Sequence, residues 1–217
     1  MVILPIGKKL KKRVHKIIAL AHDILVIEIY NNFSTAIIHG GTAIWRCYGS
    51  NRFSEDVDVY LPLNTKEVNF ENFLNGLKGK GFIIEKFKKT NNSIFAKFSY
   101  SGAIVRFEVL FKNIKNFVTR TFEMSDGTSI LVNTLKPEEI IIEKVSAYIK
   151  RKKVRDLYDI FFLLKLVEDK EKIKSALMKL TKEFVQPIDE KELKALIISG
   201  SVPSLKEMLS VMRKWAR

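Results

Sequence analysis

The alternation of apolar and polar positions predicts two kinds of structure in two parts of the chain. Up to about residue 134, short strand-like runs are interspersed with helical patterns. The predicted helices cover 8–32, a segment from Thr42 to about Tyr48, and 66–79. The predicted strands cover 36–38, 56–61, 82–87, 94–100, 103–111 and 129–132. This part of the chain is therefore expected to form a small mixed sheet with helices.

The pattern beyond residue 134 is helical throughout. Pro137 stands where a helix can begin, because the first turn of a helix does not need the missing N–H. Helices are predicted over 137–151, 154–168, 170–184, 189–198 and 203–216. The sequence thus predicts an α+β protein with two domains, 1–134 with the mixed sheet and 135–217 as a helical bundle.

Charge narrows the class of partner. The 217 residues include 38 Lys and Arg against 24 Asp and Glu, a formal net charge of +14. Such a basic excess favours polyanions, namely nucleic acid, nucleotides or an anionic membrane surface. A Lys-rich surface also occurs where Lys, Ile, Phe and Asn rise together in thermophiles or AT-rich genomes, so charge alone leaves the partner open.

Two features limit the cellular setting. The apolar stretch from Ile17 to Tyr30 is too short to span a bilayer and contains His22, Asp23 and Glu28, so no membrane partner is expected. Cys47 is the single cysteine, which excludes an intramolecular disulfide and a thiolate zinc cluster. A reducing cytoplasm fits this composition.

A pair of glycines lies between a predicted strand and a predicted helix. Gly40 and Gly41 have no Cβ that would keep a phosphate from the backbone. The helix that follows would offer unpaired N–H groups and the positive end of its dipole to that phosphate. Thr42 could cap the helix or bond the phosphate. The segment is a candidate nucleotide-binding loop.

Two carboxylates follow on the next predicted strand. Asp56 and Asp58 are two residues apart, so both side chains point to the same face of the strand. Carboxylate oxygens in this arrangement can hold Mg²⁺ or Mn²⁺. Such ions bridge the phosphates and the attacking oxygen in an in-line displacement. Glycine pairs and D-x-D segments are common singly, but their order and separation here are specific.

The segment Ile38–Ala43, followed by Arg52–Asp58, resembles the abortive-infection AbiEii/AbiGii toxin family of nucleotidyltransferases, which has a polymerase-β-like catalytic fold. In the helical half, Glu143-Lys144 before Arg155–Asp159 extends the resemblance. It implies a metal-dependent transfer of a nucleotide from an NTP, within a toxin–antitoxin-like system in which a cognate antitoxin is a candidate partner.

The resemblance also implies a third carboxylate on a neighbouring strand, as a metal ligand or a base for the acceptor hydroxyl. Glu108 is the candidate, because Val105, Phe107 and Val109 would occupy one face and leave Arg106 and Glu108 on the other. An ordinary cross-strand Arg–Glu pair on this face is the alternative.

The remaining candidates would bind the nucleotide. By resemblance, Lys144 reaches the triphosphate, for which a mobile point charge is suited. Asp156 or Asp159 would be an active-site acid or would clamp Lys144, with Asp156 ranked first, although Asp156 could also be a helix cap. Arg52 and Ser54 could touch phosphate or brace the loop before the aspartates.

We therefore expect a nucleotidyltransferase whose acceptor is RNA, with a tRNA end as one option. The basic run Lys150–Lys153 could seat the RNA backbone, or could be a solvated helix face. Transfer to a small molecule or a protein is one alternative function. A non-catalytic nucleic-acid-binding module is another, although such a module would be expected to have lost a glycine or an aspartate of the two motifs.

Overall fold

The computed structural model describes residues 4–217, which divide into two compact units. The first unit runs up to Gly49 and continues over Phe53–Thr134, and the second comprises Ser50–Arg52 and Leu135–Arg217. The division after Thr134 coincides with the change of pattern in the sequence, whereas the short segment Ser50–Arg52 groups with the helices that follow much later. That the units act as a catalytic and a helical domain stays a prediction.

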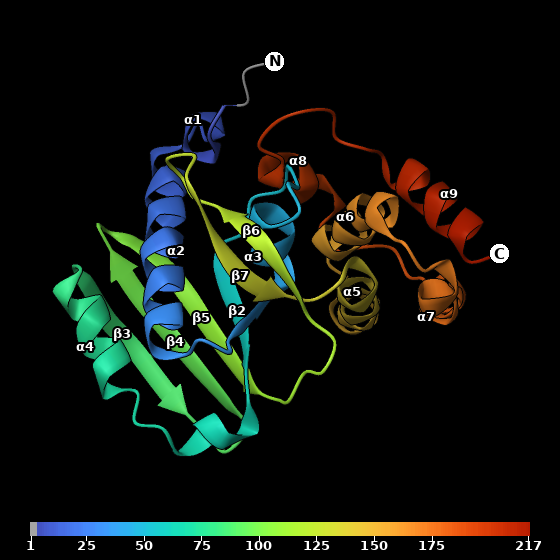
Figure 1. Ribbon diagram of the computed structural model, residues 1–217. Coiled ribbons are helices and arrows are strands. Elements are labelled where there is room, and N and C mark those ends of the chain that lie inside the picture. The colour runs from blue at the N-terminus through green and yellow to red at the C-terminus, as the bar shows by residue number, and fades with distance from the viewer. Residues whose placement is uncertain (1–3) are drawn as a thin grey trace. The chain divides into compact units, whose positions relative to one another are not determined.

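The strands of the described residues form one mixed sheet in the first unit, in the order β3-β4-β5-β2-β1-β7-β6 (Figure 1). The pairs β2–β5 and β1–β7 are parallel, and the other pairs are antiparallel. The strands are β1 (Ile37–His39), β2 (Asp56–Leu61), β3 (Phe82–Lys89), β4 (Ser93–Tyr100), β5 (Ala103–Phe111), β6 (Val118–Glu123) and β7 (Ser129–Thr134). The mixed sheet predicted from the pattern is confirmed.

Strand β6 was not predicted, because its sequence carries almost no signal. It lies at the edge of the sheet, and Phe122 is its one fully buried side chain among exposed threonine and arginine residues. An edge strand that buries so little shows no clear alternation. Its partner β7 is two residues longer than the predicted strand, which ended at Val132.

The helices of the first unit also differ from the prediction in detail. The single helix expected over 8–32 is two helices, α1 (Ile6–Lys9) and α2 (Arg13–Asn32), because the backbone at Leu10 is extended. The helix expected over 66–79 begins later, as α4 (Glu71–Gly79). Before it, Leu63–Glu67 forms a short 3₁₀ turn, η1.

One face of the sheet is covered by helices and carries the core. Helix α2 contacts α4 and strand β5, and α4 contacts β3, so both helices cover the same side of the sheet (Figure 1). Rings pack beneath them, with Phe73 of α4 5.5 Å from Phe107 of β5 and Phe107 6.0 Å from Phe98 of β4. All three are fully buried. Burial of these large rings contributes to the stability of the unit.

The second unit is helical, as predicted. Its elements are α5 (Pro137–Arg151), α6 (Val154–Leu163), η2 (Leu164–Leu166), α7 (Lys170–Lys182), η3 (Glu190–Glu192), α8 (Leu193–Leu196) and α9 (Leu205–Trp215). The helices predicted over 154–168 and 189–198 were too long, since each is partly a 3₁₀ turn. Helix α5 packs on α6 and α7, and α9 packs on the same two helices. Among the described residues, no helix is long and apolar enough to cross a membrane.

Candidate active site

The candidate metal-binding carboxylates lie on adjacent parallel strands in the first unit. Asp58 of β2 is in register with Glu108 of β5, and Asp56 is in register with Arg106. Val57 lies between the two aspartates along the strand and is fully buried, so the aspartates occupy the opposite face. The tertiary structure thus places Asp56, Asp58 and Glu108 together on one face of the sheet, as the sequence predicted.

The glycine loop contacts the second aspartate. Helix α3 (Gly40–Arg46) begins at the first glycine, directly after β1. Gly40 has a φ of +68°, and a Cβ at this position would lie 2.9 Å from the Asp58 Cγ. Only glycine fits here on both grounds. The two sequence motifs, which are separated along the chain, therefore form one structure at the start of α3.

Two side chains fix the backbone that enters β2. The Thr42 hydroxyl donates a hydrogen bond to the carbonyl of Asp56. The Nε2 atom of His22, on α2, lies 3.1 Å from the carbonyl oxygen of Glu55. Burial lowers the pKa of His22 to about 3, so its ring is neutral and can donate this bond. The alternative that Thr42 caps α3 was wrong, because the helix starts two residues earlier.

Arg106 bonds the first aspartate. Its Nε donates to Oδ1 of Asp56, and its Nη2 lies 3.6 Å from a carboxylate oxygen of Glu55. The hydrogen bond to Asp56 outweighs partial burial and raises the pKa of Arg106. The alternative predicted from the sequence was an ordinary cross-strand Arg–Glu pair. Arg106 instead donates its hydrogen bond to an aspartate of the neighbouring strand, Asp56.

The donor set suits a hard cation, because carboxylate oxygens are the ligands that Mg²⁺ and Mn²⁺ prefer. In this conformation, residues 4–217 contain no group of three His, Cys, Asp or Glu side chains that converge as a metal site. The residues fit a metal ion chemically, and the Arg106 guanidinium already contacts one carboxylate oxygen of Asp56, Oδ1.

In the second unit, two buried acids surround Lys144. The Lys144 Nζ lies 2.7 Å from Asp159 and 3.5 Å from Asp156. Arg52 donates two hydrogen bonds to Asp159, of 2.6 and 2.9 Å, and Arg151 donates two to Asp156, of 2.7 and 2.6 Å. Both aspartates are fully buried. Each acid therefore has its own arginine and shares one lysine.

The distances to Lys144 favour Asp159 over Asp156, the reverse of the order predicted from the sequence. Asp159 lies closer to Lys144 than Asp156 does, although Asp156 had been ranked first. Burial opposes the charge of Asp159, but Arg52 and Lys144 outweigh it and keep the pKa of Asp159 below its usual value. Arg52 is 3% exposed and is held by Asp159, which fits the bracing role proposed for it. Ser54, the other loop candidate, is also buried.

The role of Asp156 as a helix cap is taken by another residue. Helix α6 begins at Val154, and the Val154 N–H donates to Oδ1 of Asp189 at 2.7 Å. Asp156 is therefore inside the first turn and is not the cap. Asp189 comes from the segment before η3, so the cap could not be found from the sequence around α6.

The basic run Lys150–Lys153 is partly neutralised. Arg151 bonds Asp156, and Lys153 lies 3.4 Å from Asp189. Lys152 has a left-handed backbone at the end of α5, and its Nζ donates to the carbonyl of Ile149. Since these side chains contact their own unit, the run offers less charge to an RNA backbone than the sequence suggests.

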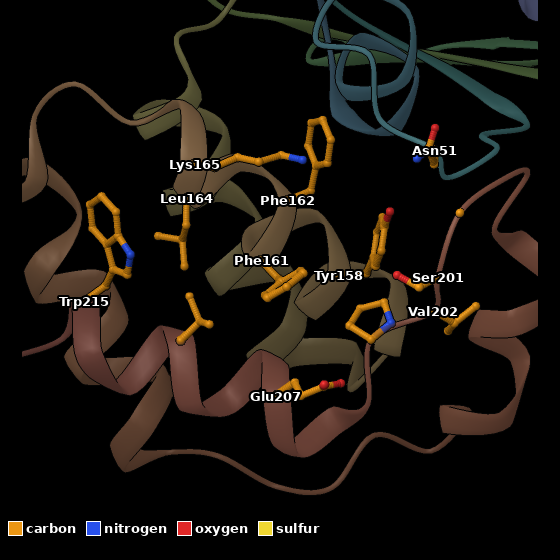
Figure 2. Close-up of a pocket in the computed structure, with 13 residues that line it drawn as sticks. Asn51, Tyr158, Phe161, Phe162, Leu164, Lys165, Ser201, Val202, Glu207 and Trp215 are labelled. Carbon is orange, nitrogen blue, oxygen red and sulfur yellow. The ribbon is translucent and has the colours of Figure 1, made fainter.

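The second unit also contains an aromatic-lined pocket of about 690 Å³ (Figure 2). Tyr158 and Phe161 of α6 and Trp215 at the end of α9 form part of its wall. Asn51 and Tyr158 are the sequence neighbours of Arg52 and Asp159, so the pocket adjoins the buried cluster. The one carboxylate of its lining, Glu207, caps α9 through Ser204, so this pocket is a poor candidate for the metal site.

Three residues were missed as site residues from the sequence. Arg106 was considered only as a member of an ordinary Arg–Glu pair, and neither His22 nor Asp189 was considered as a site residue. The alternation over β5 could have identified Arg106, because it stands in the same row as the aspartates once β2 and β5 are paired. Nothing in the local sequence signals His22 or Asp189, whose partners are distant in the chain.

Comparisons with known proteins identify the family and the fold. The family model for the "Nucleotidyl transferase AbiEii toxin, Type IV TA system" matches residues 28–209. A Helicobacter pylori protein assigned as a nucleotidyltransferase has a similar crystal structure, with a TM-score of 0.62, 23% identity and coverage of 91% of this chain and 92% of that one. JHP933 from Helicobacter pylori is similar at a TM-score of 0.60, with 24% identity and coverage of 91% and 90%. No curated protein matches the chain. The structural likenesses confirm the predicted fold.

Proposed function

Since this chain belongs to the AbiEii nucleotidyl transferase toxin family, it is a transferase, and we propose that it moves a nucleotide from an NTP to RNA with Mg²⁺ or Mn²⁺. The type IV toxin–antitoxin assignment of the family implies an antitoxin partner. The observation that carries the proposal is the contact of Gly40 with Asp58, which joins a phosphate-binding loop to a carboxylate pair.

The first unit would perform the chemistry. Asp56 and Asp58 would hold the metal ion, with Glu108 as a further ligand or as the base that accepts the proton of the acceptor hydroxyl. A divalent ion held there would neutralise charge on the phosphates. The acceptor oxygen would then bond to the α-phosphorus as the bond to the pyrophosphate oxygen breaks. Gly40, Gly41 and Thr42 would bind the phosphates through their backbone N–H groups, while the Thr42 hydroxyl keeps its hydrogen bond to the Asp56 carbonyl.

The second unit would contribute positive charge to nucleotide binding. Lys144 is the candidate, because Asp156 and Asp159 hold its ammonium group in one place. Arg52, together with Ser54 in the loop before β2, would act indirectly by fixing the loop that leads to the metal-binding aspartates. An ammonium group that is already oriented loses little side-chain entropy when it binds a phosphate.

Charge favours RNA among the candidate acceptors. The net charge of +14 favours a polyanion, and an RNA acceptor satisfies it, whereas an acceptor pocket for a cationic small molecule would be acidic. Transfer to RNA and transfer to protein give different labelled products, so a labelling experiment distinguishes the two acceptors directly.

The test offers each α-³²P-labelled NTP with Mg²⁺ and either total RNA or total protein to the full chain. Label should enter RNA with the wild type, and Asp58→Asn should reduce the rate by at least about 100-fold because a metal ligand is lost. Glu85→Gln, which removes an exposed carboxylate of the same sheet, is the matched control and should transfer at the wild-type rate. Label in protein alone, or transfer by Asp58→Asn at the wild-type rate, would contradict the proposal.

A further inference from the structure

The face of the sheet that carries the aspartates continues across the neighbouring strands. Strand register places the side chains of this face in two rows across β2, β5, β4 and β3. The first row is Asp58, Glu108, Phe95 and Lys88, and the second is Asp56, Arg106, Lys97 and Lys86. Three interstrand spacings separate the first and last member of each row, about 14 Å in all. The acidic end of both rows is the candidate metal site, and the other end is basic.

This face is open to solvent. On the helix-covered face the corresponding side chains are buried, whereas on the open face Ile83 is 63% exposed and Ile104 is 47% exposed. Lys86, Lys88 and Lys97 are also exposed, and Phe95 is half-buried. A ligand could therefore contact this face without any rearrangement of the first unit.

Two lysines of this face lie opposite each other, which destabilises the fold. Lys86 and Lys97 are directly opposite on an antiparallel pair, and like charges in that position are destabilising. Among residues 4–217, no ion pair involves Lys86, Lys88 or Lys97. No carboxylate of the described residues neutralises these three cations, whereas an anion with several charges would bind them together.

Phe95 determines what kind of polyanion suits the face. Its ring lies between Glu108 and Lys88 in the first row, and the Lys86 Nζ lies 5.5 Å from the ring centroid. A partly exposed aromatic ring among lysines is the combination that binds single strands, since unpaired bases stack on the ring and lysines neutralise the phosphates. A duplex hides its bases and could use the lysines only.

We propose that a single-stranded segment of the RNA acceptor crosses the open face of β3, β4 and β5, with one base on Phe95 and phosphates at Lys86, Lys88 and Lys97. Its terminal hydroxyl then reaches the aspartates at the end of the rows. This inference rests on the proposed function only for the direction of the strand. The basic run of α5 is the less suitable surface, since Arg151 and Lys153 bond buried acids.

The first experiment tests the lysines by measuring, from fluorescence anisotropy over a salt series without NTP or metal, the binding of a fluorescein-labelled uridine 12-mer. The triple variant Lys86→Gln, Lys88→Gln, Lys97→Gln should bind the oligomer more weakly. The slope of log affinity against log salt concentration should become shallower by about 2, because each phosphate neutralised on a single strand contributes about 0.7. Lys89→Gln is the control, because Lys89 follows Lys88 on β3 but faces Phe70 on the opposite side. Equal slopes for the wild type and the triple variant would overturn the proposal.

The second experiment tests Phe95 by comparing the binding of the uridine 12-mer with that of an abasic 12-mer of the same backbone. Phe95→Leu keeps an apolar side chain but cannot stack, so it should weaken binding of the uridine 12-mer by about 5- to 150-fold and leave the abasic 12-mer unchanged. Phe95→Trp should restore the affinity. Equal losses for both oligomers, or duplex RNA bound as tightly as the single strand, would overturn the inference.

These binding measurements fail independently of the transfer assay. If the wild type labels RNA but the lysine and Phe95 variants bind RNA normally, the inference is wrong and the proposed function stands. If the variants lose RNA binding as expected but no NTP labels RNA, the surface is confirmed as an RNA-binding face and the proposed function is wrong.

Discussion

The Asp58 side chain occupies the space that a Cβ at residue 40 would need. The positive φ of Gly40 turns the chain so that such a Cβ would lie 2.9 Å from the Asp58 Cγ and 3.2 Å from its Cβ. The glycine is thus required by the neighbouring side chain as well as by its own backbone. The position of Asp58 depends on the absence of an atom at residue 40, which links the geometry of the loop to that of the carboxylate.

Gly40→Ala should therefore displace Asp58 and reduce nucleotide transfer by about 100-fold, the effect expected of a shift near 1 Å at a reacting centre. The left-handed backbone adds a stability loss of about 1–2 kcal/mol. Gly49→Ala separates the two effects, because Gly49 has a φ of +72° with no atom within 4 Å of the added Cβ. It should show the stability loss in urea denaturation and keep wild-type activity. Similar activity losses in both variants would refute a role for the contact.

Arg106 and a metal ion should compete for Asp56. Removal of the guanidinium in Arg106→Gln should lower the Mg²⁺ concentration for half-maximal thermal stabilisation by about two- to fivefold, the worth of a partly exposed ion pair. Differential scanning fluorimetry over a Mg²⁺ series measures this. Arg120→Gln, which removes an exposed arginine of β6, is the control for net charge and should leave the midpoint unchanged. A higher Mg²⁺ requirement in Arg106→Gln would show that Arg106 supports the metal site.

Arg52 should contribute mainly to the stability of the fold, whereas Lys144 should contribute mainly to NTP binding. Arg52→Ala removes both short hydrogen bonds from the fully buried Asp159, so we expect a loss of about 3–5 kcal/mol in the free energy of unfolding. Lys144→Ala leaves each acid its arginine and should cost less stability. It should nonetheless weaken NTP binding by about 1.5–3 kcal/mol, the worth of a charge-assisted contact.

Urea denaturation and equilibrium NTP titration give both quantities, with Lys152→Ala as a control from the same part of the chain. If Lys144→Ala binds NTP as the wild type does, the lysine serves only the buried cluster.

His22 should make the protein acid-sensitive. Its folded pKa is about 3, because burial and then the charge of Arg46 disfavour the imidazolium, whereas the unfolded ring titrates near pH 6.5. The unfolded state therefore binds the extra proton first, so stability is complete above pH 6.5 and falls as the pH decreases towards 3.

The contribution of His22 between pH 6.5 and pH 4 amounts to about 3 kcal/mol. Urea denaturation of the wild type and of His22→Gln, in which the amide can still donate to the Glu55 carbonyl, isolates it. The stability advantage of the wild type over the variant should shrink by that amount over this range. A constant difference between the two proteins would mean that His22 titrates normally in the folded state.

Much of the fold and the centre of the site could be predicted from local patterns. Alternation identified most strands, helical spacing identified the second half of the chain, and the order of Gly40, Gly41, Asp56 and Asp58 indicated a candidate phosphate-binding loop and a carboxylate pair. These features depend on the period of the backbone and on conformations that glycine alone adopts, so they are encoded within short segments.

Only the tertiary structure decided the partners of the charged groups. Arg106 bonds Asp56, Arg52 bonds Asp159 over 107 residues of chain, and Asp189 caps a helix that starts 35 residues earlier. An ion pair or a cap requires two groups within about 3 Å, and the sequence does not specify which distant segments come that close. The sequence determined which chemistry the chain carries, and the pairing of strands and packing of helices determined which atoms meet, because side-chain direction is local whereas proximity is set by the whole fold.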